Sequence, residues 1–340
     1  MKAFKYILFL VLILIIGLSI YIAVQPNSFE VKRTKTIQAP AAVVYNHVID
    51  LKTWEAWSSW AESDPNLIIT LSDQTSGVNG SYSWEDKDGV GTMKTVDAKP
   101  NTFIQQEMQF ADFPKSDVSW ELNTNAEGTT EVTWTIAGND LPFGFKAFAF
   151  ISGGMEKQIG PHYERSLNKL DSIIVADMKT FEVKIDGITR HSGGFYLYNT
   201  TSCKMDDFKS KMQEMLPKVG DYVKNNNIST AGMPFISYHK WDMQNNSVMF
   251  SCCVPISAQV LTTESDILTG QLNPFRAVKT TLKGNYENLK VAWDATMSYI
   301  PEHNLEFTET GPMLEVYLTD PMNTPNPKDW TTEIYIAIKE

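Results

Sequence analysis

Glutamate and tyrosine alternate with aliphatic residues in three segments of the C-terminal half, a spacing that is typical of β-strands. Successive side chains of a strand point to opposite faces, so one face of these strands carries Glu315 with Tyr317, Glu333 with Tyr335, and Tyr196 with Tyr198. We expect the aliphatic residues between them to pack under helices. The other face then gathers tyrosines and carboxylates, which favours a ligand-binding concavity. The alternative is a sheet face that loops merely cover.

The other reactive residues form no recognisable catalytic or metal-binding pattern. The sequence contains no Gly-x-Ser-x-Gly elbow, no phosphate-binding loop and no GxGxxG motif. None of the histidines lies at a metal-ligand spacing from another; they are His47, His162, His191, His239 and His303. We therefore predict no metal, no cofactor and no catalytic residue.

One apolar run without a charge, Tyr6–Val24, lies near the N-terminus. As a helix it would span roughly 28 Å, close to the ~30 Å hydrocarbon core of a bilayer. A cleaved secretory signal is the alternative. Such a signal has a shorter apolar region of about 7–15 residues before a small-x-small cleavage site. Tyr21 stands where a small residue would be wanted for cleavage after Ala23, so we predict a retained anchor.

The basic residues around this run indicate its orientation. Lys2 and Lys5 precede it and favour a cytoplasmic N-terminus, whereas Lys32, Arg33 and Lys35 follow it and weaken that bias. We predict a single-pass membrane protein with its body outside the cytoplasm, which is the periplasm if the source is a Gram-negative bacterium. The net charge of −11 argues against nucleic acid as a partner, because phosphate binding needs a basic surface.

After the anchor, the first part of the chain has an expected order of strand, helix, six antiparallel strands and a long closing helix. Apolar residues at helical spacing mark the last helix, and they are Ile159, Tyr163, Leu167, Leu170 and Ile174. Together with Trp54-x-x-Trp57-Ser58-x-Trp60 and 128–134, this order resembles the START-related, polyketide-cyclase-like superfamily with its helix-grip fold. The resemblance implies a curved sheet around the long helix and a largely apolar cavity between them.

The second part of the chain repeats a pattern of strand, helix and strands, which suggests two duplicated α/β halves. Lys283-Gly284-x-Tyr286-x-x-Leu289, the segment 315–321 and the strand 332–336 resemble the GyrI-like, effector-binding domain of bacterial multidrug-sensing regulators. The DNA-binding helix pair of those regulators is missing. The resemblance implies that Glu315 is the pocket glutamate that meets cationic aromatic ligands.

We therefore predict an α+β chain with a membrane anchor at 1–28, a helix-grip domain at 29–176 and a GyrI-like domain at 181–340. The expected ligand-binding residues are Glu315, Tyr317, Tyr335, Tyr196 and Tyr198, with Trp293 if its helix end reaches the cavity, and Glu333 at the rim or in a salt bridge. The predicted function is a non-catalytic, tethered binder of small hydrophobic or amphipathic molecules, cations included. A hydrolase of small electrophiles built on the Glu/Tyr pocket and an interaction protein with vestigial pockets are the alternatives.

Overall fold

The structure is a computed structural model that describes residues 2–340 except 88, 127 and 309. The chain divides into two compact units between Asp177 and Met178. Each unit is built around one antiparallel sheet, so the α+β class expected from the sequence is confirmed.

The first unit begins with the apolar helix α1 (Lys2–Ala23), in which the stretch Phe4–Ala23 has a mean hydropathy of 2.8 and is long enough to cross a membrane. Its seven-stranded sheet has the order β1-β7-β6-β5-β4-β3-β2. The strands are β1 (Phe29–Ile37), β2 (Ile68–Leu71), β3 (Ser81–Asp86), β4 (Gly89–Lys99), β5 (Phe103–Phe110), β6 (Ser116–Thr124) and β7 (Thr130–Gly138). The helices are α2 (Ala41–Ile49), α3 (Trp54–Trp57), α4 (Ser59–Ser63), α5 (Phe143–Ile151) and α6 (Met155–Met178), with a 3-10 turn at Leu51–Thr53.

Helix α6 packs on the sheet through the apolar stripe that the sequence predicts. Ile159, Tyr163, Leu167, Leu170 and Ile174 are all buried. Their spacing keeps them on one side of a helix with 3.6 residues per turn, which is why the sequence alone identified the face.

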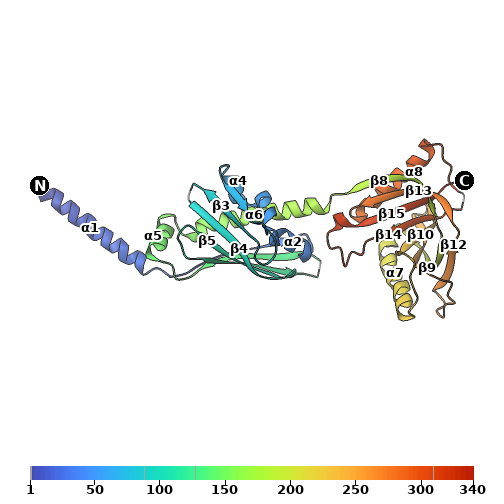
Figure 1. Cartoon of the computed structure of the whole chain (residues 1–340), viewed down its shortest axis with the longest axis horizontal. Helices are drawn as coiled ribbons and strands as arrows, with labels where there is room; N and C mark the ends of the chain where they lie inside the picture. Colours follow the sequence, from blue (N-terminus) through green and yellow to red (C-terminus); the bar gives the residue numbers. More distant parts are fainter. Residues whose placement is uncertain (1, 88, 127, 309) are drawn as a thin grey trace. The chain divides into compact units, whose positions relative to one another are not determined.

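The second unit has an eight-stranded sheet with the order β12-β9-β11-β10-β14-β15-β13-β8 (Figure 1). Its strands are β8 (Glu182–His191), β9 (Gly194–Lys204), β10 (Phe235–Asp242), β11 (Ser247–Ile256), β12 (Leu268–Leu272), β13 (Phe275–Lys283), β14 (Met313–Tyr317) and β15 (Thr331–Ala337). The helices are α7 (Phe208–Asn225) and α8 (Leu289–Glu302), with 3-10 turns at Met205–Asp207, Tyr286–Asn288 and Pro327–Asp329. Helix α7 continues through Pro217.

Trypsin should separate the two units. Lys179 is exposed and follows the last residue of α6, in the short segment before β8. We expect limited proteolysis of the full chain to cut after Lys179 and leave two stable fragments, because few backbone hydrogen bonds hold a segment between domains. Mass spectrometry of the fragments checks this, and Lys179→Gln should remove the cut. Early cleavage within either sheet would contradict separate domains at 29–176 and 181–340.

Candidate functional site

The carboxylate of Glu315 lies on the helix-facing side of the second sheet and is only 2% exposed. Glu315 pairs with Ile236 of β10 on one side and Ile334 of β15 on the other. Directly paired residues share a face, so Glu315 is set among the aliphatic residues that the helices cover. We call Glu315, Tyr238, Trp293 and Tyr317 the Glu315 site.

Three aromatic donors surround the Glu315 carboxylate. The indole Nε1 of Trp293 donates to Oε2 at 2.8 Å, and the hydroxyl of Tyr238 donates to the same oxygen at 3.3 Å. The hydroxyl of Tyr317 donates to Oε1. Trp293 comes from α8, whereas Tyr238 and Tyr317 come from neighbouring strands of the sheet. The carboxylate is thus held by one helix and two strands.

Partly buried side chains of the helix side close over these groups. Met212 of α7 lies with its sulfur 3.3 Å from the Tyr317 hydroxyl, and Phe208 of α7 stacks at 5.8 Å on Tyr238. Tyr286 meets Tyr317 edge-on, with 5.3 Å between ring centroids. The Glu315 site is therefore enclosed by aromatic rings and a flexible methionine.

Burial controls the protonation of the Glu315 site. Desolvation raises the pKa of Glu315, although its hydrogen bonds from Tyr317, Trp293 and Tyr238 oppose that shift. Burial and the nearby carboxylate also raise the pKa values of Tyr317 and Tyr238 well above 10. Among the described residues no lysine, arginine or histidine forms an ion pair with Glu315. The carboxylate is therefore buried without a compensating cation.

The stability of the second unit should fall as pH rises through the folded-state pKa of Glu315. The unfolded side chain ionises near its ordinary value of 4.5, while the folded pKa is higher. Between the unfolded-state pKa and the folded-state pKa, Glu315 is protonated in the folded protein and ionised in the unfolded chain. The stabilisation from this proton is therefore complete below the unfolded-state pKa and lost above the folded-state pKa. Thermal unfolding between pH 4 and 8 should show this slope in the wild type and lose it in Glu315→Gln.

A surface carboxylate provides the matched control for this pH series. Glu306 is exposed and its salt bridge with Lys339 lowers its pKa. Glu306→Gln should therefore leave the Glu315 slope in place. Equal slopes in the wild type and in Glu315→Gln would show that the buried carboxylate does not titrate as described.

The single face predicted for the tyrosines and glutamates is wrong. Within each strand the alternation is as predicted, but the register pairs Tyr335 with Leu314 and Glu333 with Val316. The face opposite Glu315 and Tyr317 therefore carries Tyr335 and Glu333. The β9–β11–β10–β14 pairing also places Tyr198 on the Val316 side, and Tyr196 two residues along the same strand.

The helices cover the Glu315 face and not the Leu314 and Val316 face. Alternation fixes which residues of one strand point together, whereas the offset between strands decides which of those groups become neighbours. The predicted site thus divides into Glu315, Tyr317 and Trp293 on one face and Tyr196, Tyr198, Glu333 and Tyr335 on the other.

The three tyrosines of the second group pack against a small apolar cluster of Phe235, Cys253 and Leu314. Glu333 forms a salt bridge of 2.6 Å with Lys279, one of the two environments expected for it, and accepts a hydrogen bond of 2.7 Å from the Tyr335 hydroxyl. Its charge is therefore already compensated, in contrast with that of Glu315.

Sequence reasoning missed Tyr238 and Met212 as parts of the site. Tyr238 lies in β10, two residues after Ile236, the partner of Glu315, so the two share its face. The alternation of side chains in 235–238 could have identified Tyr238 only if the pairing of β10 with β14 had been known. Met212 lies in α7, and nothing in the local sequence indicates its contact with Tyr317.

In the first unit, tryptophan rings fill space between the sheet and α6. Trp120 of β6 and Trp134 of β7 stack with centroids 4.2 Å apart, and Trp134 stacks at 3.6 Å on Tyr163 of α6. Trp54 and Trp57 of α3 meet both sheet tryptophans edge-on. Between Trp120 of the sheet and Tyr163 of α6, aromatic rings therefore fill space in which the resemblance implied an apolar cavity.

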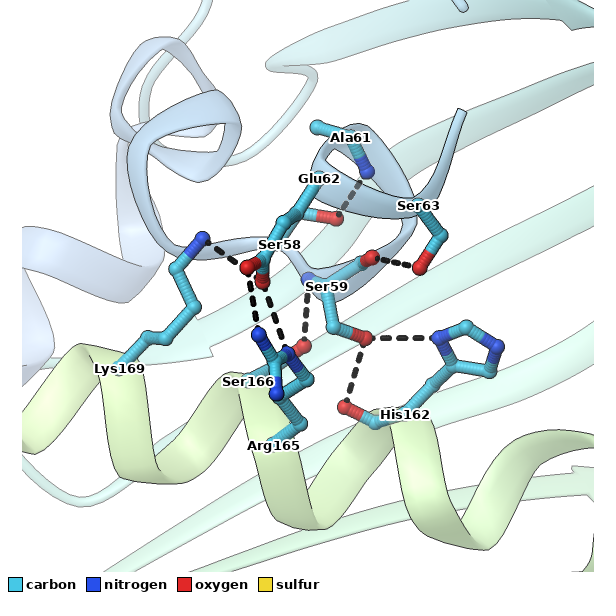
Figure 2. A network of polar contacts seen from close by, with 9 residues as sticks. All are labelled: Ser58, Ser59, Ala61, Glu62, Ser63, His162, Arg165, Ser166 and Lys169. Atoms are coloured by element: carbon cyan, nitrogen blue, oxygen red, sulfur yellow. Dashed lines mark hydrogen bonds and ion pairs between the residues drawn. The ribbon is translucent and has the colours of Figure 1, made fainter. Parts of the chain in front are cut away.

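Polar contacts fasten α4 to α6 beside these rings. Figure 2 shows Ser59 directed at His162, whose Nδ1 lies 2.7 Å from the serine Oγ, while the backbone N–H of Ser59 donates to Ser166 Oγ at 3.0 Å. Glu62 accepts from Arg165 Nε at 2.8 Å. Ser59 is fully buried, so the Ser59–His162 pair joins two helices and offers no accessible nucleophile.

No group of three or more histidine, cysteine, aspartate or glutamate residues is placed to hold a metal ion in the described part of the chain. In the second unit, a carboxylate, aromatic rings and burial coincide at the Glu315 site.

A seven-stranded sheet with a long helix, followed by an eight-stranded sheet that buries a carboxylate under its helices, defines a protein of two α+β domains. Residues 28–174 match the family model described as polyketide cyclase / dehydrase and lipid transport. Residues 196–339 match the GyrI-like small molecule binding domain. The chain thus carries a polyketide-cyclase-like domain followed by a GyrI-like domain, as the sequence motifs predicted.

Solved structures that match this chain include the crystal structure of the EcmrR C-terminal domain. It is 17% identical, with 47% of this chain and 98% of that chain covered and a TM-score of 0.41. EcmrR in a cryo-EM complex with DNA is 16% identical, with 58% and 78% covered and a TM-score of 0.41. CalU16 from Micromonospora echinospora is 13% identical, with 44% and 87% covered and a TM-score of 0.30. No curated protein matches the chain.

Proposed function

We propose that this protein binds small hydrophobic or amphipathic cations at the Glu315 site and does so without turning them over. The observation that carries this proposal is a carboxylate buried to 2% exposure, held by three aromatic donors, with no cationic partner among the described residues. A ligand cation would supply the missing charge and gain cation–π contact with the surrounding rings. The description of the matching family as small molecule binding supports the same reading.

The ligand would reach Glu315 by displacing side chains that close over it. Met212, Phe208 and Trp293 are only partly buried and pack on the core from the helix side. Methionine adapts to new shapes at low cost, and Trp293 can exchange its hydrogen bond to Glu315 for stacking on the ligand. An amphipathic molecule with a flat apolar part and one positive charge fits these requirements.

A thermal-shift screen of organic cations against the full chain tests this function, with mass spectrometry of every hit. A binder raises the melting temperature and is recovered intact, since binding to the folded state alone stabilises it. Conversion of the hit would instead establish the hydrolase alternative. No shift with any cation, together with shifts for neutral or anionic lipids, would contradict a cation site.

The mirrored strand order of the second unit supports a duplicated origin. Strands β9, β11 and β10 with α7 correspond to β13, β15 and β14 with α8. The first half of the unit begins with β8 and the second with β12. Each of these first strands pairs at the outer edge of the other half, β8 with β13 and β12 with β9. The two halves would then have exchanged their first strands.

We propose that α1 tethers the body to a membrane from outside the cytoplasm. Only 6% of the window Phe4–Ala23 is buried, so the described part of the first unit leaves nearly all of its apolar side chains uncovered. A reporter enzyme fused after Glu340 should be active only outside the cytoplasm and remain with the membrane fraction. Cytoplasmic activity would reverse the orientation, and a shorter soluble product would favour a cleaved signal.

A further inference from the structure

Helix α5 joins β7 to α6 and is almost entirely apolar. Its sequence is FGFKAFAFI, and Lys146 is its only charged residue. Phe145 is buried, stacks on Phe29 at 5.7 Å and meets Phe113 edge-on at 5.1 Å. One ring of α5 thus fixes the helix to the first sheet at the ends of its strands.

Four large apolar side chains of α5 stay exposed beside this contact, and one of them, Phe148, touches Phe113 at 6.3 Å between ring centroids with the rest of its ring open. The exposed fractions are 49% for Phe143, 48% for Phe148, 45% for Phe150 and 83% for Ile151. At 3.6 residues per turn these four positions follow one another around an arc of about 160°, so they form one continuous patch over nearly half of the helix. A patch of this kind on a soluble surface marks an interaction site.

Lys146 does not break the apolar character of the patch. It is 9% exposed, and its ammonium group donates to the carbonyl of Ala23 at 3.1 Å and to that of Gln25 at 2.8 Å. These carbonyls lie at the C-terminal end of α1, where backbone acceptors lack helical partners. The only charge of α5 is therefore used to cap the apolar helix.

The patch is continuous with the end of α1. Phe150 meets Tyr21 of α1 edge-on, with 5.6 Å between ring centroids. Figure 1 shows α5 beside the end of α1 that leads into the first domain. Tyrosine near the end of a membrane span lies at headgroup level, so Tyr21 places Phe150 at the depth of the membrane surface.

From this geometry we infer that α5 is a second membrane contact, with Phe143, Phe148, Phe150 and Ile151 inserted at the boundary between headgroups and acyl chains. The inference rests on the proposed membrane span of α1. Short apolar helices bind in this way through the area that they bury. Because α5 exposes no cation, contact with lipid should need no anionic headgroup. We expect the bilayer to cover the patch, because the patch continues from the end of the proposed membrane helix α1.

Nitroxide labels on the full chain in phosphatidylcholine vesicles test this contact. Labels would be placed singly at Phe150→Cys, at Leu12→Cys in the middle of α1, and at Thr124→Cys as a water-exposed control. Thr124 ends β6 at the opposite end from Ser116, which pairs with Gly138 close to α5. Cys203→Ser removes the partly exposed native thiol, while Cys252 and Cys253 are buried. Circular dichroism verifies that each variant is folded.

Collision rates with oxygen, which concentrates in lipid, and with a water-soluble nickel chelate report each environment. We expect oxygen to dominate at positions 12 and 150 and nickel at 124, equally with and without added phosphatidylglycerol. Lipid exposure at 12 with water exposure at 150 would overturn the α5 contact and leave the anchor intact. Low collision with both reagents at 150 would show a protein partner and also overturn it. Water exposure at 12 would remove the anchor and the α5 contact together.

Discussion

Replacing Trp120 with alanine should destabilise the first domain by about 3–5 kcal/mol, the range for emptying a large buried aromatic site. Trp120 is fully buried and stacks on Trp134 at 4.2 Å, and its Nε1 donates to the Oε1 of Gln106 at 3.2 Å. The substitution removes the ring and leaves the buried Gln106 oxygen without this donor. Both effects act in the same direction.

Hydrogen exchange of the full chain, resolved by peptide, measures this loss domain by domain. Amides of β6 and β7 should exchange about 10²- to 4 × 10³-fold faster, since each 1.4 kcal/mol is tenfold. Peptides of the second domain provide an internal control and should be unchanged. Trp60→Ala is the matched variant, because Trp60 belongs to the same ring cluster but is 37% exposed. An equal effect of the two substitutions would contradict a core role for Trp120.

Glu315→Gln should weaken binding of a cationic ligand by about 1–3 kcal/mol, the range for losing a charged partner. Benzyltrimethylammonium and its uncharged isostere neopentylbenzene make a suitable pair, because they have nearly the same shape. The variant should bind the cation about 5- to 150-fold more weakly and the isostere about as well as the wild type does. Titration calorimetry on the full chain gives both values.

Glu333→Gln is the control for this change. Glu333 is neutralised by Lys279 on the opposite face of the sheet, so its loss should alter cation affinity little. An unchanged affinity in Glu315→Gln would show that the buried carboxylate is not the charged centre. A larger effect at Glu333 would place the ligand on the other face.

The parts of the fold set by local pattern were predictable from the sequence. Apolar spacing identified the buried side of α6, and alternation identified which residues of β14 and β15 point together. Motifs identified both domain families. Each of these properties depends on residues close together in the chain.

Features set by long-range contacts were not predictable in the same way. The offset between β14 and β15 separates Glu315 from Tyr335, and no local pattern encodes that offset. Likewise, α5 was not expected, and its contact joins residues Tyr21 and Phe150, which are far apart in sequence. The filling of the first domain by Trp134 on Tyr163 also depends on how closely a helix approaches a sheet.

The Lys146 contact restricts how freely the N-terminal helix can move relative to the first domain. By themselves, the five residues between Ala23 and Phe29 would be a flexible linker that lets the domain reorient freely relative to α1. Two hydrogen bonds from Lys146 and the ring contact of Tyr21 with Phe150 instead hold the end of α1 rigidly against the first domain. A helix that tilts to match a thinner or thicker bilayer would then tilt the first domain with it. If α1 spans a bilayer as we propose, the orientation of the first domain would change with the thickness of that bilayer.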